Sequence, residues 1–273
     1  MSIEIRVHKA SSGARWYKAG LDIFQRQPFI FMFMYMFIAA VGMLGFVLPL
    51  LKIPAALATP FLLAGFYQAA LRRQQGHKVA FADILNVFSQ QGRRMLLFRV
   101  GLYQMGAALL LGMVSSLLFA DAVAVLSQPD IDPQVALQEL AQSFSFPAVA
   151  LILVLFSVYL CAFAFAVPLV YFGGHTSMWA VMKASLLAFY RNMAAMTVYG
   201  LIGAALMLVC AILSLIPLLV VMPICYISLF IAFQAIFMPQ LQQHEGDKGA
   251  VDRAQNEQAK PQESHSSDGR FDA

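Results

Sequence analysis

The chain alternates between long apolar runs and short polar segments. The apolar runs cover residues 29–51, 53–71, 95–120, 146–172 and 193–238. A bilayer core about 30 Å thick is crossed by roughly 20 apolar residues in a helix. The last run is long enough for two crossings, and Ser214–Pro217 is its natural turn. The pattern therefore predicts an all-α membrane protein with six transmembrane helices, the last two at 193–213 and 216–238.

The polar segments differ sharply in their content of lysine and arginine. Five of these residues precede the first apolar run, five lie between the second and third runs, and two lie between the fourth and fifth. The segment between the third and fourth runs has none, and it carries acidic residues instead: Asp121, Asp130, Asp132 and Glu139. Basic residues concentrate on the cytoplasmic side of membrane proteins. We therefore expect a multi-pass membrane protein with both termini in the cytoplasm.

The domain organisation follows from the same pattern. Residues 1–13 form an N-terminal cytoplasmic segment, residues 14–240 form the membrane domain, and residues 241–273 form a polar cytoplasmic tail. The tail has too few apolar residues to bury a core, so we expect it to be disordered. Between the third and fourth runs, Asp132 followed by Pro133 is typical of a helix start. This short helix would lie flat over the outer mouth of the bundle.

Composition excludes several classes of protein. Hydrophobic residues make up 60% of the chain and charged residues 12%, whereas soluble domains contain about 25% charged residues. A net charge of +4 would indicate a nucleic-acid partner in a soluble protein. Here the positive charges flank apolar runs, so membrane lipids are the expected partners and nucleic acid is not. The three cysteines lie inside apolar runs without paired spacing, which indicates neither disulfides nor a metal site.

A short motif recurs ahead of two apolar runs. Lys18-Ala19-Gly20-Leu21 leads to Phe24, Arg26 and Gln27, and the segment from Lys183 to Asn192 repeats the pattern at an offset of 165 residues. A weaker copy at residues 80–92 has an apolar helical face followed by Arg93-Arg94. These copies predict three units, each with an interfacial helix at 14–27, 80–92 or 176–190 and then a helical hairpin. A simpler interpretation is that basic residues before a span only set its orientation.

Some residues are candidates for contact with lipid or a ligand. The expected interface residues are basic or indole side chains near the cytoplasmic ends of the spans: Arg26, Arg93, Arg94, Arg99, Arg191, Trp16 and Trp179. Three amides fall in the cytoplasmic third of their spans and are candidates for a shared polar cavity: Gln68, Gln104 and Gln234. Gly200 and Ala204 are spaced for close helix packing.

Motifs for catalysis are missing from the sequence. The spans contain no Asp or Glu, and the chain has no HExxH, GxSxG or Walker motif. We therefore expect no enzyme activity, no catalytic residues, no cofactor and no metal.

The stretch Trp16–Pro28, WYKAGLDIFQRQP, precedes an aromatic-rich span and a hairpin that contains prolines. This layout resembles a broad group of uncharacterised bacterial inner-membrane proteins, and also the membrane domain fused to some glycerophosphodiester phosphodiesterases. The resemblance covers most of residues 14–240 and implies a fold type, a bacterial inner membrane and an association with lipid metabolism. It does not imply hydrolase activity, because we find no soluble catalytic region in these residues.

Two classes of function remain open from the sequence. The neutral spans, the expected interfacial helices and the basic inner face favour a non-enzymatic membrane or lipid-associated accessory factor. The alternative is a small-solute or lipid transporter or channel, which would need a continuous polar path through the bundle. A cavity shared by the three glutamines would favour this alternative.

Overall fold

The computed structural model describes residues 3–90, 92–128, 132–213 and 216–238, and these residues contain helices and no strands. The turn expected at Ser214–Pro217 lies partly outside this range, and the tail at 241–273 lies entirely outside it. The elements in chain order are α1 Ser11–Gln25, α2 Pro28–Val47, η1 Pro49–Leu51, α3 Lys52–Gln74, η2 Phe81–Ser89, α4 Arg94–Leu118, α5 Ala120–Leu126, α6 Pro133–Ser143, α7 Phe146–Ala164, α8 Ala166–Tyr171, α9 Met178–Arg191, α10 Met193–Ile212 and α11 Leu218–Phe237.

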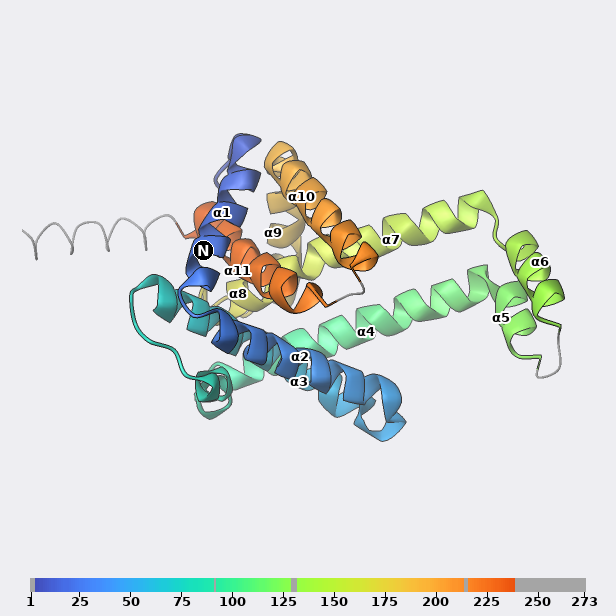
Figure 1. The fold of residues 1–273 in the computed structure, drawn as a ribbon, viewed down its shortest axis with the longest axis horizontal. Coiled ribbons are helices and arrows are strands. Elements are labelled where there is room, and N and C mark those ends of the chain that lie inside the picture. Colours follow the sequence, from blue (N-terminus) through green and yellow to red (C-terminus); the bar gives the residue numbers. More distant parts are fainter. Residues whose placement is uncertain (1–2, 91, 129–131, 214–215, 239–273) are drawn as a thin grey trace, which may run out of the picture.

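Six helical segments among the described residues are long and apolar enough to cross a membrane. They are Pro28–Val47, Pro49–Gln74, Arg94–Leu118, Phe146–Tyr171, Met193–Ile212 and Leu218–Phe237. The predicted all-α membrane class is thus confirmed, with span boundaries close to those expected. Figure 1 shows that α2 and α3 form a hairpin, and that α4 and α7 run side by side to α5 and α6, away from the end that holds α1, α8 and α9. The remaining two spans are α10 and α11. We call the end that holds α1, α8 and α9, with η2, the basic end, because it carries most of the lysine and arginine.

Local sequence signals set several helix ends. Pro28 stands in the first turn of α2, where its missing N–H costs nothing. The Asp132 carboxylate accepts a hydrogen bond of 2.8 Å from the Gln134 N–H and caps α6, as its sequence predicted. Gly76 has a φ of +88° after the end of α3, a conformation that glycine adopts without a steric penalty.

Two of the three expected interfacial helices differ from the prediction. α1 was expected to lie on the surface, but Trp16 in it is only 5% exposed because α1 packs against α10 and α11. The close approach depends on glycine: a Cβ added at Gly20 would lie 2.9 Å from the Cβ of Ser228. The segment at 80–92 contains the short 3₁₀ helix η2 instead of an α-helix, and its Ile84 backbone lies directly against Gly65 of α3.

The helices η2 and α9 each pack against the spans that precede them in the chain: η2 contacts α3, and α9 contacts α7 and α8. The first helix, α1, precedes the six spans, and it packs against the last two of them, α10 and α11. Gln27 and Asn192 are separated by the repeat offset of 165 residues, and both side chains bind backbone groups just ahead of one of these helices. Gln27 exchanges two hydrogen bonds with the backbone of Val79 ahead of η2, and Asn192 bonds to the backbone of Arg6 and His8 ahead of α1. The common origin of the three units stays a prediction.

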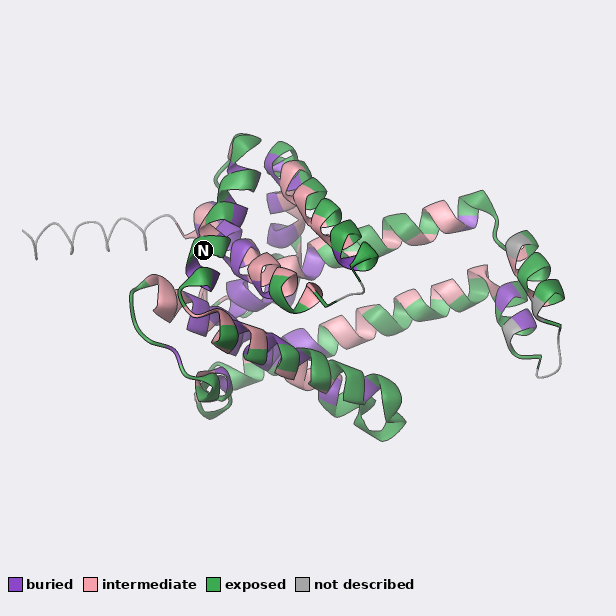
Figure 2. Ribbon diagram, viewed as in Figure 1, coloured by how far each residue is buried: buried purple, intermediate pink, exposed green. Residues whose placement is uncertain are grey.

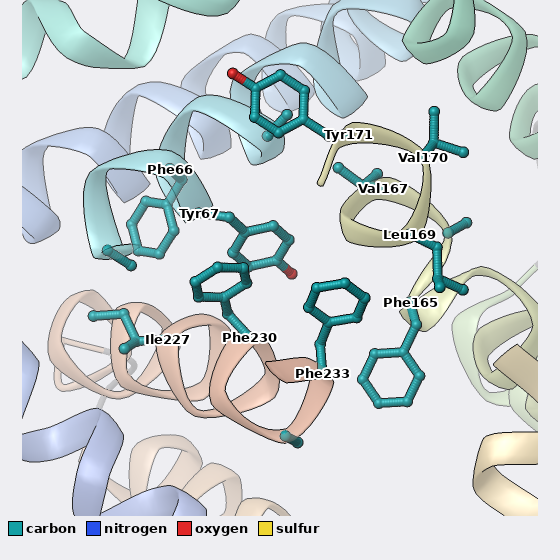
Figure 3. Packing of buried hydrophobic residues seen from close by; sticks show 14 of the residues in the cluster. Phe66, Tyr67, Phe165, Val167, Leu169, Val170, Tyr171, Ile227, Phe230 and Phe233 are labelled. Carbon is teal, nitrogen blue, oxygen red and sulfur yellow. The ribbon is translucent and has the colours of Figure 1, made fainter. Parts of the chain in front are cut away.

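The packed core lies toward the basic end. Figure 2 shows buried residues concentrated where α1, α3, α8 and α11 meet, and mainly exposed residues along α4 and α7 beyond it. Aromatic rings fill the core: Tyr67 of α3 stacks on Phe230 of α11 with ring centroids 5.2 Å apart, and Phe233 lies close by (Figure 3). Because the core holds the ends of α3 and α8 in place, it also positions the polar residues described next.

Candidate functional site

A cavity of about 600 Å³ opens at the basic end, between the ends of several helices. Its lining comes from α3, from the segment joining η2 to α4, and from the end of α8: Gln68, Leu71, Arg72, Gln75, Gln90, Arg93, Tyr171 and Phe172. The lining therefore contains two guanidinium groups, three amides and a phenol, and it contains no carboxylate. This volume is typical of sites for small molecules.

Tyr171 joins the two sides of this cavity. Its side chain is buried, and its hydroxyl oxygen lies 2.8 Å from Oε1 of Gln68 and 2.7 Å from Oε1 of Gln90. A phenol has one proton, so it donates to one of these amides and accepts from the NH₂ group of the other after an amide flip. Figure 3 shows Tyr171 apart from the rings of Phe230 and Phe233. Both glutamines are thus held in fixed positions at the cavity wall.

The two arginines of the cavity have different surroundings. Arg72 donates from Nη1 to Oδ1 of Asp83 at 2.9 Å, which is the one ion pair within the described residues. Asp83 also accepts from the Ala80 N–H and from the Asn86 side chain, and these bonds fix it at the start of η2. Arg93 has its Cζ 5.1 Å from the centre of the Tyr171 ring, a cation–π contact. The cavity therefore presents positive charge that its own lining does not balance.

The structure places the three predicted cavity glutamines in different surroundings. Gln68 lines the cavity, whereas Gln104 and Gln234 are not among its lining residues. Gln104 is half-buried on α4. Gln234 is 5% exposed within α11, and its Oε1 has no hydrogen-bond partner among the described residues. Gln75 and Gln90, which the sequence pattern did not indicate, line the cavity together with Gln68.

The predicted interface residues are mostly exposed, with one exception. Arg26, Arg93, Arg94, Arg99 and Arg191 are all exposed, and of these only Arg93 lines the cavity. Trp179 is 75% exposed. The prediction for Trp16 is wrong, because this indole is buried in the core and meets the His8 ring edge-on at 5.8 Å. The burial of α1 against α10 and α11 explains the difference.

The sequence did not single out Tyr171, Gln90, Arg72 or Gln75 as parts of one site. Arg72 and Gln75 lie one and two helical turns after Gln68 on α3, a spacing that places them on the same side of the helix. Tyr171 is distant in sequence and ends a long apolar run, which gave no signal that its hydroxyl meets two amides. Only the contact of α8 with α3 and α4 brings these residues together.

Other parts of the molecule offer less polar chemistry. Two apolar cavities of about 270 and 380 Å³ lie between α4 and α7, near Met182 of α9. His175, in the segment between α8 and α9, is half-buried, and burial lowers its pKa below the ordinary histidine value. Within the described residues, no group of three or more His, Cys, Asp or Glu side chains is arranged to hold a metal ion.

The fold and its spans define an all-helical, multi-pass integral membrane protein. Residues 47–172 match the model of a family described as predicted integral membrane protein (DUF2189). This match covers α3 to α8 and so includes every residue that lines the cavity. No curated protein and no solved structure matches the chain. The chain is therefore similar to an uncharacterised family of membrane proteins.

Proposed function

We propose that this protein is a non-enzymatic, lipid-associated accessory factor of the bacterial inner membrane, with both termini in the cytoplasm and its basic end against the anionic headgroups. The observation that supports this is the separation of charge between the two ends. Between Arg6 and Arg191 the basic end carries 13 lysines and arginines and two acidic residues, Asp22 and Asp83. The described residues of the opposite end carry Lys52 and three acidic residues.

The positive charge of the basic end favours contact with anionic lipids. The inner leaflet carries anionic lipids, and each lysine or arginine close to it contributes roughly 1 kcal/mol of attraction. The resemblance of Trp16–Pro28 and the following hairpin to membrane domains fused to glycerophosphodiester phosphodiesterases also supports a role near lipid metabolism. Lipids are the partners in this proposal, and no nucleic acid takes part.

Transport of a small solute or lipid is the second candidate, and the cavity at the basic end favours it. A carrier also needs polar groups deeper in the membrane. Three hydroxyls at depth donate to carbonyls of their own helices: Thr59 to Ala55, Ser116 to Met113, and Ser157 to Leu153. Because these donors are used locally, they offer little to a solute crossing the bundle, and we rank this candidate second.

Reporter fusions test the orientation. Fusions within residues 76–80 and after residue 240 should report the cytoplasm, and fusions within 125–140 should report the periplasm. A periplasmic signal from the fusion after residue 240 would overturn the orientation, and the proposed contact of the basic end with the inner leaflet would fail with it.

Lipid dependence tests the association itself. The full chain is placed in nanodiscs of phosphatidylcholine, or of phosphatidylcholine mixed with phosphatidylglycerol, and thermal unfolding is measured at low and high salt. We expect a higher midpoint in the anionic discs at low salt. Replacing the exposed Lys18, Lys78 and Lys183 by Gln should reduce this difference, whereas Lys52→Gln at the opposite end should preserve it. Equal midpoints in both discs would contradict the proposal.

A further inference from the structure

The cavity at the basic end differs from the rest of the basic surface because its polar groups are held in place. Exposed lysines attract any anion loosely, since their long side chains remain flexible. The cavity groups instead line one open cavity of about 600 Å³. Tyr171 fixes Gln68 and Gln90 through its hydroxyl and contacts Arg93 through its ring face. Pre-organised groups of this kind lose little conformational entropy when a ligand binds.

The positive charge of the cavity lining favours an anionic ligand. Arg93 has no ion-pair partner among the described residues, and the single ion pair of Arg72 uses Nη1 alone. Arg93 is also the N-cap residue of α4, a helix of 25 residues, and no side chain caps this helix start. The N-terminus of a helix favours anions through its free N–H groups and its dipole. Two guanidinium groups thus line the cavity, and one of them stands at the start of α4.

The opposing charges near the cavity are already compensated. Asp83 is engaged by Arg72, by the Ala80 N–H and by Asn86. The carbonyl groups at the end of α3 accept hydrogen bonds from the backbone N–H groups of Gln75, Gly76 and His77. They therefore do not compete for the arginines. Arginine pairs with phosphate through two parallel hydrogen bonds, a geometry that lysine cannot offer.

We propose that this cavity binds one phosphate group, held by Arg93 and Arg72, with Tyr171 as a positioning residue that keeps the amides of Gln68 and Gln90 in place. The phosphate belongs to a phospholipid headgroup or to a soluble phosphorylated molecule, since both present the same chemistry. The inference rests on the proposed orientation, which places the ends of α3 and α8 at the level of the inner headgroups.

The binding experiment uses the full chain and two sources of phosphate. In the first arm, protein in detergent is titrated with phosphatidic acid or phosphatidylglycerol, and native mass spectrometry counts the bound lipids. In the second arm, inorganic phosphate or glycerol 3-phosphate is added to protein in phosphatidylcholine nanodiscs, and calorimetry measures binding. We expect one saturable site in at least one arm, and the arm that shows it identifies the source.

Neighbouring residues provide matched variants. Arg93→Ala should weaken the saturable site at least tenfold, whereas Arg94→Ala removes the same charge one residue later, outside the cavity lining, and should change affinity less than twofold. Tyr171→Phe retains the ring and loses the hydroxyl, so it should weaken the site while leaving the salt dependence of binding unchanged. Gln90→Glu places a carboxylate in the cavity and should abolish binding, while Ser89→Glu adds the same charge outside it and should not.

Two results would overturn the inference without touching the proposed function. One is equal weakening by Arg93→Ala and Arg94→Ala, which would indicate attraction to the surface as a whole. The other is no saturable binding in either arm while anionic nanodiscs still raise the unfolding midpoint. If Arg93→Ala fails to fold, the pair Gln90→Glu and Ser89→Glu decides the question, and equal affinities in that pair would also overturn the inference.

Discussion

α10 and α11 are alike as sequences and different as parts of the structure. Both have 20 residues, and their most apolar windows have the same mean hydropathy. Yet 56% of the window in α11 is buried within the protein, compared with 17% in α10. Figure 2 shows the same contrast along their ribbons. Apolar length therefore identifies both as spans, but it does not determine which one faces protein and which one faces lipid.

The difference arises from the residues that neighbouring helices bring to each span. α11 receives Gly20 of α1 against Ser228 and stacks Phe230 on Tyr67 of α3. α10 keeps large apolar side chains exposed, including Leu201, Leu208 and Ile212. Lipid solvates these side chains as well as a protein core does, so helix association depends on close packing of small residues. The buried position of α11 thus depends on glycine in another helix.

The largest expected loss of stability comes from adding a side chain at Gly20, where α1 contacts α11. Gly20→Val places a Cβ 2.9 Å from the Cβ and backbone nitrogen of Ser228, so one helix must move. Overpacking of this kind costs typically about 1–3 kcal/mol, and we expect the upper end because backbone is involved. The free energy of unfolding in detergent, measured by chemical denaturation, should fall accordingly.

Gly200→Val is the matched control on α10. A Cβ at Gly200 would meet nothing within 4 Å, so this variant should unfold within about 0.5 kcal/mol of the wild type. The close-packing face expected from the spacing of Gly200 and Ala204 is therefore not found among the residues that the structure describes. Equal losses for the two valine variants would show that the burial of α11 does not depend on the contact with α1.

A smaller effect should come from the link between the start of α10 and the end of α11. Asn192 accepts from the His8 N–H at 2.8 Å and donates to the Arg6 carbonyl at 3.0 Å, while the Arg6 N–H donates to the Ile236 carbonyl of α11. Asn192→Leu leaves these two backbone groups without their partner, at a cost of about 2 kcal/mol. Hydrogen exchange at the His8 amide should become faster.

Thr197→Val, one turn further along α10 on an exposed position, serves as its control. Exchange at His8 should match the wild type in this variant. If His8 exchanges equally fast in the wild type and in Asn192→Leu, the side chain of Asn192 does not hold the N-terminal segment.

The smallest effect concerns the polar group buried in α11. Gln234 is 5% exposed, and its Oε1 lacks a partner among the described residues. Gln234→Met has a similar shape and removes the desolvated amide, so it should raise the free energy of unfolding by about 1 kcal/mol. The thermal midpoint in detergent measures this change. A loss of stability would indicate that Gln234 has a polar partner, and Gln104→Met provides the comparison at a half-buried position.

Much of the architecture was predictable because it depends on local properties. Apolar runs of spanning length located all six spans, and the Asp132-Pro133 pair located the start of α6. The offset of 165 residues matched Gln27 with Asn192, and both proved to bind the backbone ahead of a short helix. The burial of Trp16 was not predictable, because an indole next to a basic segment fits a membrane interface as well as a core.

The sequence by itself determined that this chain crosses a membrane and that its positive charge gathers at one end, because transfer of apolar side chains into lipid and the placement of lysine and arginine are properties of short segments. Only the tertiary structure decided which spans are enclosed and which polar residues share a cavity. Tyr171 meets Gln68 and Gln90 across 103 and 81 residues of chain. Contacts at such separations depend on how helices approach one another, and hydropathy does not encode that approach.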